Sequence, residues 1–146
     1  MSLENINIDA LKKQLVLHEG MKLTPYRCTA DKLTIGVGRN LDDMGITERE
    51  AEFMLDTDIQ RCCDDLDRNL SWWRDLSETR QRVLVDMVFN LGINRFMKFQ
   101  NAIDALANGN HAGCAAEMLD SRWADQVGQR AQRLARAMET DELDLS

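Results

Sequence analysis

Three residues near the amino terminus have side chains and spacing that suit acid–base chemistry: Glu19, Cys28 nine residues later, and Thr34 six residues after that. Glu19 precedes Gly20 at the end of a predicted helix, where the negative end of the helix dipole disfavours a carboxylate. Such a position favours the protonated acid, which a general acid needs at neutral pH. The alternative is an exposed glutamate at a helix end, and Glu19 alone does not decide between them.

The pattern of apolar residues predicts the elements that position these side chains. Residues 8–19 repeat apolar side chains at helical spacing, whereas residues 21–38 combine turn signals with β-branched residues and predict a small antiparallel sheet. Thr47 and Glu50 form a predicted capping box for a helix over residues 47–69, and the chain is helical in period from Ser77 onwards. The fold class is therefore α+β, mostly helical. The acidic end, residues 139–146, predicts a frayed, solvated tail.

Composition limits the class of protein. The chain has 146 residues, 44% of them hydrophobic and 29% charged, with no repeat or linker, which is typical of one globular domain. A net charge of −7 argues against broad binding to nucleic acid or to anionic membranes. We find no membrane-spanning run and no export signal, and therefore expect a cytoplasmic protein without membrane insertion. The four cysteines lack zinc-ligand spacing, so we expect reduced thiols, no metal and no cofactor.

The chain resembles the phage-type lysozymes, glycoside hydrolase family 24, in three blocks of sequence. The first is the active-site signature of a glutamate ending the first helix, an aspartate nine residues on and a threonine six further, which correspond to Glu19, Cys28 and Thr34. The threonine lies in LTIGVG at residues 33–38, which matches the T-I-G-x-G strand of the family. DMVFNLG at residues 86–92 and SRWADQVGQRA at residues 121–131 resemble two later family segments in the same order.

The resemblance implies a two-lobed lysozyme fold within a single domain over residues 1–146. It implies a β-lobe at about 20–46, a connecting helix at 47–69, and a helical lobe built from residues 1–19 and 70–146. The substrate cleft is then expected between the lobes. The segment between Asn40 and Thr47 is short, so the β-lobe is expected to be smaller than in the enzymes of T-even phages.

The sequence departs from the family pattern at Cys28, where an aspartate is usual. A thiol has an ordinary pKa of about 8.5 and is mostly neutral at pH 7 unless its surroundings favour the thiolate. Cys28 would act either as a thiolate nucleophile that forms a covalent glycosyl intermediate, or as a base that orients water together with Thr34. A small buried thiol in an inactive lysozyme fold is the structural alternative.

The resemblance also implies contacts with the substrate. Sugar contacts carried over from the family fall at four positions: Asn40, Phe89, Ala102 and Glu117. The last two differ from the serine and asparagine of the T-even pattern. By the same resemblance, Arg122 is expected near the cleft, and Arg130 is expected to face Glu19 as a supporting ion pair.

We therefore expect an endolysin with muramidase activity, which hydrolyses the β-1,4 bond between N-acetylmuramic acid and N-acetylglucosamine in peptidoglycan and lyses the host cell. Its expected partner is the glycan strand, without nucleic acid, and the protein is expected to be a monomer. It would accumulate in the cytoplasm of the infected bacterium and reach the wall in the periplasm after a separate membrane-lesion protein acts. A lytic transglycosylase and a non-catalytic wall-binding protein of the same fold are the alternatives.

Overall fold

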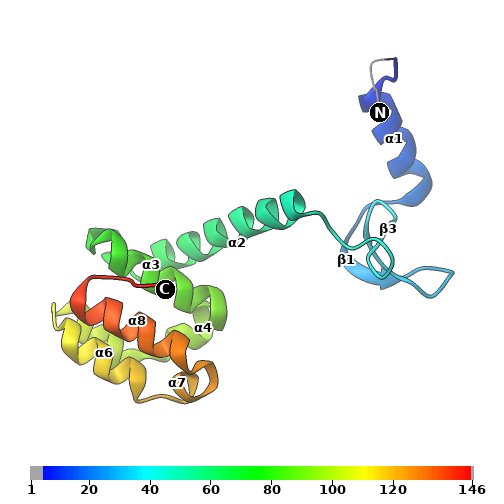
Figure 1. Cartoon of the computed structure of the whole chain (residues 1–146). Coiled ribbons are helices and arrows are strands. Elements are labelled where there is room, and N and C mark those ends of the chain that lie inside the picture. The colour runs from blue at the N-terminus through cyan, green and yellow to red at the C-terminus, as the bar shows by residue number, and fades with distance from the viewer. Residues whose placement is uncertain (1–4, 146) are drawn as a thin grey trace. The chain divides into compact units, whose positions relative to one another are not determined.

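The chain divides into two compact units, an amino-terminal unit of residues 1–53 and a carboxyl-terminal unit of residues 54–146. The computed structural model describes residues 5–145 and confirms the mostly helical α+β class (Figure 1). The division falls inside the longest helix, α2 (Glu48–Asn69). Within residues 5–145, no helix combines the length and the apolar character that crossing a membrane requires.

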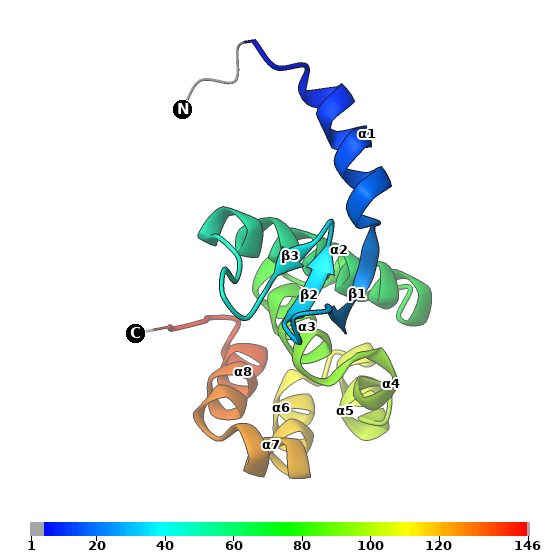
Figure 2. The same cartoon turned by 90° about the vertical axis from the view of Figure 1, so that its right-hand side faces the viewer.

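The amino-terminal unit begins with helix α1 (Ile8–Glu19), which has the predicted bounds. Three antiparallel strands follow in the order β1 (Lys22–Arg27), β2 (Leu33–Gly36) and β3 (Arg39–Asn40) (Figure 2). The predicted sheet over residues 21–38 is confirmed, and the two-residue strand β3 extends it beyond the predicted range. Chain order and sheet order coincide, because each strand returns through a short connection to pair with the preceding one.

The start of α2 is the predicted capping box. The Thr47 hydroxyl accepts the backbone N–H of Glu50 at 3.1 Å, and the Glu50 carboxylate accepts the backbone N–H of Thr47 at 2.9 Å. Each side chain thus satisfies a backbone donor that the first turn of a helix leaves without a partner. This reciprocal arrangement fixes where the helix begins.

The carboxyl-terminal unit consists of the remainder of α2 and a set of shorter helices. They are the 3₁₀ helix η1 (Trp73–Asp75), α3 (Glu78–Leu91), α4 (Ile93–Phe96), α5 (Gln100–Ala107), α6 (His111–Leu119), α7 (Arg122–Val127) and α8 (Gln129–Thr140). Helix α6 packs against both α5 and α8, and α3 packs against α4 and α8.

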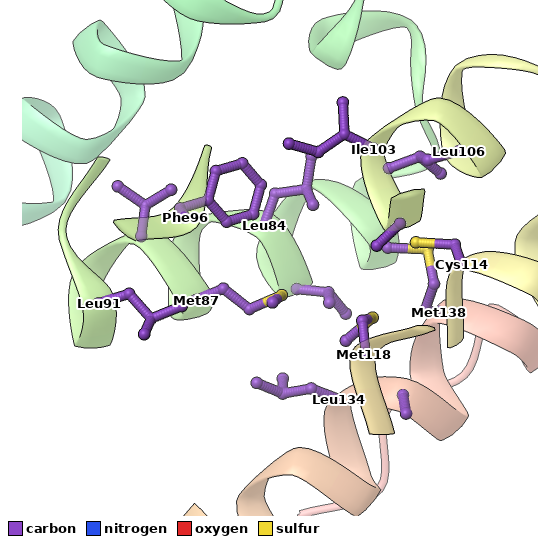
Figure 3. Packing of buried hydrophobic residues seen from close by; sticks show 14 of the residues in the cluster. Leu84, Met87, Leu91, Phe96, Ile103, Leu106, Cys114, Met118, Leu134 and Met138 are labelled. Atoms are coloured by element: carbon purple, nitrogen blue, oxygen red, sulfur yellow. The ribbon is translucent and has the colours of Figure 1, made fainter. Parts of the chain in front are cut away.

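The hydrophobic core of this unit is formed by apolar stripes from α3, α5, α6 and α8, which meet in its interior (Figure 3). Met87, Met118 and Met138 are almost completely buried, and Cys114 lies among them as a small apolar side chain. Methionine fills irregular gaps well because its side chain is unbranched and flexible. The core therefore gives the helices around it one fixed packing arrangement.

The segment predicted as a frayed tail is ordered in its first part. Glu139 and Thr140 belong to α8, and the Arg80 guanidinium donates to the carbonyl oxygens of Met138 and Glu139 at 2.7 and 3.2 Å. The Ser77 hydroxyl donates a hydrogen bond to Asp141, and Leu143 is half-buried against the core. Glu142, Asp144 and Leu145 are exposed and lie outside any helix or strand, as the prediction has it; Ser146 lies outside the described residues.

Candidate active site

Glu19 is the last residue of α1, as the sequence predicted. Gly20 ends the helix with a positive φ of 77°, and its backbone N–H donates to the carbonyl of Val16 at 2.8 Å. Glycine adopts this left-handed backbone region without the steric cost that other residues meet. The chain can therefore turn from α1 directly into β1, and the Glu19 side chain is held at this corner.

The Glu19 carboxylate lies against the backbone of Gly38, in the link between β2 and β3. A Cβ atom added to Gly38 would stand 2.8 Å from Glu19 Oε2 and 3.2 Å from Glu19 Cδ, closer than a normal contact. Gly38 also has a φ of +67°. The positive φ favours glycine at residue 38, and a side chain there would also displace the Glu19 carboxylate. Gly38 is the final glycine of the LTIGVG motif, and its spacing alone does not indicate this contact.

Cys28 lies at the start of the tight turn that joins β1 to β2. Its backbone N–H donates to the carbonyl of Lys32 at 3.0 Å, and its carbonyl accepts the N–H of Asp31 at 2.8 Å. Asp31 takes a positive φ of 58°, a conformation that aspartate tolerates better than most residues. The turn therefore folds back over Cys28 and directs backbone groups of the following residues towards it.

The surroundings of Cys28 favour its thiolate form. Backbone hydrogen bonds from Lys32 and then Ala30, followed by a side-chain hydrogen bond from Thr34, lower the pKa of the Cys28 thiol. Hydrogen bonds to the charged form stabilise it, and Cys28 is only half-buried, so desolvation opposes them weakly. The thiolate is the reactive form of cysteine, so this turn is suited to nucleophilic or base chemistry.

The other three cysteines have raised pKa values, in contrast to Cys28. Burial raises the pKa of Cys62 and of Cys63, and it raises the pKa of Cys114 to about 11. Thiols with raised pKa values in apolar surroundings are unreactive. Among the four cysteines, Cys28 alone has a lowered pKa.

Thr34 lies in β2, and Cys28 follows the end of β1, the strand with which β2 pairs. The Thr34 side chain is the buried polar group of the amino-terminal unit, and its hydroxyl donates to the carbonyl of Lys32 at 2.8 Å. Thr34 pairs with Tyr26 on β1 and with Asn40 on β3. Directly opposed residues share a face of a sheet, so Tyr26, Thr34 and Asn40 form a row across all three strands. The predicted catalytic threonine and the predicted sugar-contact asparagine are therefore neighbours.

The Asn40 side chain is occupied by its own loop in this structure. Its Nδ2 donates to Asp43 Oδ2 at 2.9 Å, and its Oδ1 accepts the backbone N–H of Asp43 at 3.0 Å. Both amide atoms therefore hold the turn after β3. The contact of Asn40 with sugar remains a prediction.

Arg39 joins β3 to the start of α2. Its guanidinium donates to the two carboxylate oxygens of Glu50 at 3.0 and 2.8 Å, and to the carbonyl of Gly45 at 3.1 Å. The hydrogen bonds from Arg39, with those from Thr47, lower the pKa of Glu50 to about 2. The bidentate pair fixes the loop between β3 and α2 and, with it, the edge of the sheet that includes Asn40.

The carboxyl-terminal unit brings three of the predicted substrate residues together. Ala102, Glu117 and Arg122 line one cavity of about 430 Å³. Phe89 does not line it; the Phe89 side chain is half-exposed and lines a separate cavity of about 620 Å³. The predicted contacts of this unit thus fall into two places rather than one.

Arg130 is paired with Asp86, a partner that the sequence does not indicate. Its Nε donates to Asp86 Oδ1 at 2.8 Å, and a terminal nitrogen lies 2.7 Å from the same oxygen. Asp86 is the first residue of the DMVFNLG block, but its partner lies 44 residues away, so no local pattern indicates the pair. Glu19 belongs to the other unit, and its predicted pairing with Arg130 remains a prediction.

Comparison with known proteins identifies the class. The sequence profile of the family described as phage lysozyme matches residues 16–140, so the chain belongs to the phage lysozyme family. It is therefore an enzyme of the lysozyme class, a glycosidase. The matched range includes Glu19, Cys28 and Thr34 as well as the cavity of the carboxyl-terminal unit.

Two relatives show how far the likeness extends. "Probable T4-type lysozyme 1" of Dictyostelium discoideum is 24% identical, over 94% of this chain and 98% of the relative. An "Endolysin" of Acyrthosiphon pisum secondary endosymbiont phage 1 is 29% identical, over 82% of this chain and 84% of the relative. The likeness supports a lysozyme-type endolysin.

Proposed function

We propose that the protein is a muramidase that hydrolyses the β-1,4 bond between N-acetylmuramic acid and N-acetylglucosamine in bacterial peptidoglycan and so lyses the host cell. The supporting observation is the tight turn at Cys28, closed by backbone hydrogen bonds with Lys32 and Asp31, which lowers the pKa of the thiol at the position where the family has its second carboxylate. Family membership supplies the class of substrate.

Glu19 is the proposed general acid. Hydrolysis of a glycosidic bond requires a proton on the leaving oxygen as the bond from C1 breaks. The Glu19 carboxylate lies beside the backbone of Gly38, at the corner between α1 and the sheet. A carboxyl group placed close to the bond that breaks can deliver its proton to the leaving oxygen.

Cys28 is the proposed partner of Glu19, and its thiolate favours the nucleophilic pathway. The thiolate attacks C1 of the muramic acid unit, the C1–O bond breaks, and the Glu19 proton goes to the leaving oxygen. Water then attacks C1, its proton returns to Glu19, and the thiolate leaves. In the alternative, Cys28 acts as a base that orients water with Thr34, and the water attacks C1 directly.

Thr34 is the proposed positioning residue of this pair. Its hydroxyl donates to the carbonyl of Lys32 at 2.8 Å, the residue is only 3% exposed, and Thr34 contributes to the lowered pKa of Cys28. A buried β-branched side chain has little freedom, so the hydroxyl keeps one position near the turn. Substrate contacts are proposed for Asn40, Phe89, Ala102, Glu117 and Arg122, and support of Glu19 for Arg130.

The proposal extends to the setting of the reaction. Residues 1–146 act as one lysozyme domain, with residues 20–46 as its β-lobe, and the protein works as a monomer without a cofactor. It accumulates in the cytoplasm of the infected bacterium and acts on the wall in the periplasm once a separate protein has opened the membrane. The endolysin relative supports this route.

The deciding experiment compares the native protein with Glu19→Gln on purified peptidoglycan. The substitution keeps the size of the side chain and removes the proton, so we expect a loss of roughly 10²–10⁴-fold with an unchanged circular dichroism spectrum. Mass spectrometry of the products should show reducing ends formed by added water. Products with 1,6-anhydro ends would instead identify a lytic transglycosylase, and wall binding without cleavage would identify a non-catalytic protein.

A further inference from the structure

Asp42, in the loop after β3, is bonded to the first residue of β2. β3 is the neighbour of β2 in the sheet and ends at Asn40 (Figure 2). Beyond that end, the Leu33 carbonyl accepts the backbone N–H of Leu41 at 2.7 Å, and the Leu33 N–H donates to Asp42 Oδ2, also at 2.7 Å. A side-chain carboxylate therefore continues the hydrogen bonding between β2 and the β3 segment by one bond.

The same carboxylate oxygen also faces β1. Arg27 is paired with Leu33 in the sheet, and its guanidinium lies 3.7 Å from Asp42 Oδ2. Arg27 is the last residue of β1 and Leu33 is the first residue of β2, so the two residues flank the Cys28 turn, residues 28–32. One oxygen of Asp42 thus contacts the chain on both sides of this turn.

The two contacts of Asp42 differ in strength. A hydrogen bond of 2.7 Å to a carboxylate is short and charge-assisted, and such bonds are stronger than those between neutral groups. The ion pair with Arg27 is longer, and its side chains are 61% and 43% exposed, so water screens it. The hydrogen bond to Leu33 is therefore the contact that fixes the end of the turn.

The position of Leu33 matters for Cys28 because the groups around the thiol belong to the neighbours of Leu33. The Lys32 carbonyl accepts the Cys28 N–H at 3.0 Å and the Thr34 hydroxyl at 2.8 Å. Peptide units are planar and rigid, so a shift of the Leu33 backbone moves Lys32 and Thr34 with it. Lys32 and Thr34 are also two of the residues whose hydrogen bonds lower the pKa of Cys28.

We propose that Asp42 is a positioning residue for Cys28, because its carboxylate, bonded to the Leu33 N–H, holds the Cys28 turn in its observed shape. This inference rests on the proposed function, which makes Cys28 catalytic. Asp42 acts through the backbone of Leu33 and has no contact of its own with the reacting atoms. The loop after β3 thereby controls how reactive the thiol after β1 is.

The first test is alkylation of Cys28 by iodoacetamide at a series of pH values, followed by peptide mapping with mass spectrometry. Asp42→Ala removes the acceptor of the Leu33 N–H. We expect the pH of half-maximal alkylation of Cys28 to rise by about half a unit or more, because the groups that stabilise the thiolate are displaced. Loss of a negative charge near a thiol acts in the opposite direction, so charge alone does not explain a rise.

Two conservative variants separate the position of the acceptor from its charge. Asp42→Asn removes the charge and keeps an oxygen for the Leu33 N–H, so its Cys28 profile should stay close to that of the wild type. Asp42→Glu keeps the charge and displaces the acceptor by one methylene group, so its profile should shift towards that of Asp42→Ala. Amide hydrogen exchange at Leu33 reports the bond itself and should be fastest in Asp42→Ala. A profile that follows the charge, with Asp42→Glu like the wild type and Asp42→Asn like Asp42→Ala, would overturn the proposal.

Asp43→Ala is the matched control from the same loop. The Asp43 carboxylate lies 3.3 Å from Lys32 Nζ and accepts Asn40 Nδ2 at 2.9 Å, so it binds side chains and not the backbone of Leu33. Its removal costs the same charge and should leave the Cys28 profile unchanged. Cys63, in the other unit, is the internal reference in every variant. Equal shifts in Asp42→Ala and Asp43→Ala, or none in Asp42→Ala and Asp42→Glu, would overturn the proposal.

The second test measures kcat and KM on purified peptidoglycan. Asp42→Ala should lower kcat by roughly tenfold or more and change KM by less than about twofold, because a displaced catalytic group slows the chemical step. If the wild type cleaves no glycan, the proposed function fails, and the alkylation profiles, which need no substrate, still decide whether Asp42 positions Cys28. A shifted alkylation profile with an unchanged kcat would support the positioning by Asp42 and exclude Cys28 from catalysis.

Discussion

The Glu19 carboxylate lies against the backbone of Gly38, so that a Cβ atom at residue 38 would stand only 2.8 Å from Glu19 Oε2. We predict that Gly38→Ala reduces lysozyme activity by tenfold or more while the protein remains folded, because the new methyl group displaces the carboxyl group from its position. The measurement is kcat/KM on purified peptidoglycan together with the melting temperature.

Gly36→Ala is the matched control for this prediction. Gly36 has nearly the same φ, 68°, but an added Cβ would meet no atom within 4 Å. Both substitutions incur the cost of a left-handed alanine, about 1–2 kcal/mol, and only Gly38→Ala also disturbs Glu19. Equal losses of activity in the two variants would show that backbone strain, rather than contact with Glu19, is responsible.

We predict that Cys28 is alkylated by iodoacetamide faster, and from a lower pH, than the other cysteines. Hydrogen bonds from Lys32, Ala30 and Thr34 lower its pKa, whereas burial raises that of the half-buried Cys63. Peptide mapping by mass spectrometry at a series of pH values gives, for each cysteine, the pH at which its alkylation rate is half-maximal. Thr34→Val should raise this pH for Cys28 because it removes one hydrogen bond. An unchanged value would show that Thr34 does not lower the pKa of Cys28.

Replacement of Cys28 should separate its proposed roles. Cys28→Ala removes nucleophile and base together and should abolish cleavage, whereas Cys28→Asp restores the usual family residue and should keep substantial activity. Nuclear magnetic resonance of fresh products shows the anomeric configuration. We expect retention, since two displacements at C1 occur through a thiolate intermediate, whereas inversion would identify Cys28 as a base. Undiminished activity of Cys28→Ala would exclude both roles.

The Arg39–Glu50 pair should stabilise the amino-terminal unit in a pH-dependent way. The pKa of Glu50 falls from 4.5 to about 2 in the folded chain, so its contribution is fully present above pH 4.5 and is lost as the pH falls through about 2. Glu50→Gln should therefore lower stability at pH 7 and make little difference near pH 2. Amide hydrogen exchange of Thr47, whose N–H donates to Glu50, is the measurement.

Glu52→Gln serves as the comparison for that experiment. Glu52 is an exposed glutamate in the first turns of the same helix, and no ion pair within 4 Å joins it to another described residue. Its replacement changes the net charge equally but should leave exchange at Thr47 unaltered at both pH values. Similar protection losses in the two variants would indicate a general charge effect at the start of α2.

The sequence predicts the local elements well and the long-range contacts poorly. The bounds of α1 and the capping box of α2 depend on neighbouring residues, and both predictions are confirmed. Strand β3 has only two residues, too few to show alternation. The charge pattern of the tail does not reveal that Arg80, some 60 residues earlier, will bind it.

In the candidate site, too, the local features are predictable from the sequence and the long-range contacts are not. The spacing of Cys28 and Thr34 is visible in the sequence, and the register that pairs Arg27 with Leu33 brings the turn that begins at Cys28 close to Thr34. The contact between Glu19 and Gly38 depends on how α1 meets the sheet, and the pair of Arg130 with Asp86 depends on the packing of α8 on α3. Spacing identifies which residue types are present, whereas tertiary packing decides which of them meet.

The turn after β1 has a consequence for the evolution of this chain. Two of the hydrogen bonds that favour the Cys28 thiolate come from the backbone of Ala30 and Lys32, so almost any side chain at those two positions preserves them. Asp31, with its positive φ, is the position that restricts the turn to a few residue types. Substitutions of Ala30 and Lys32 are therefore expected to leave the pKa of Cys28 lowered, because the path of the main chain, and not the identity of those side chains, supplies the hydrogen bonds.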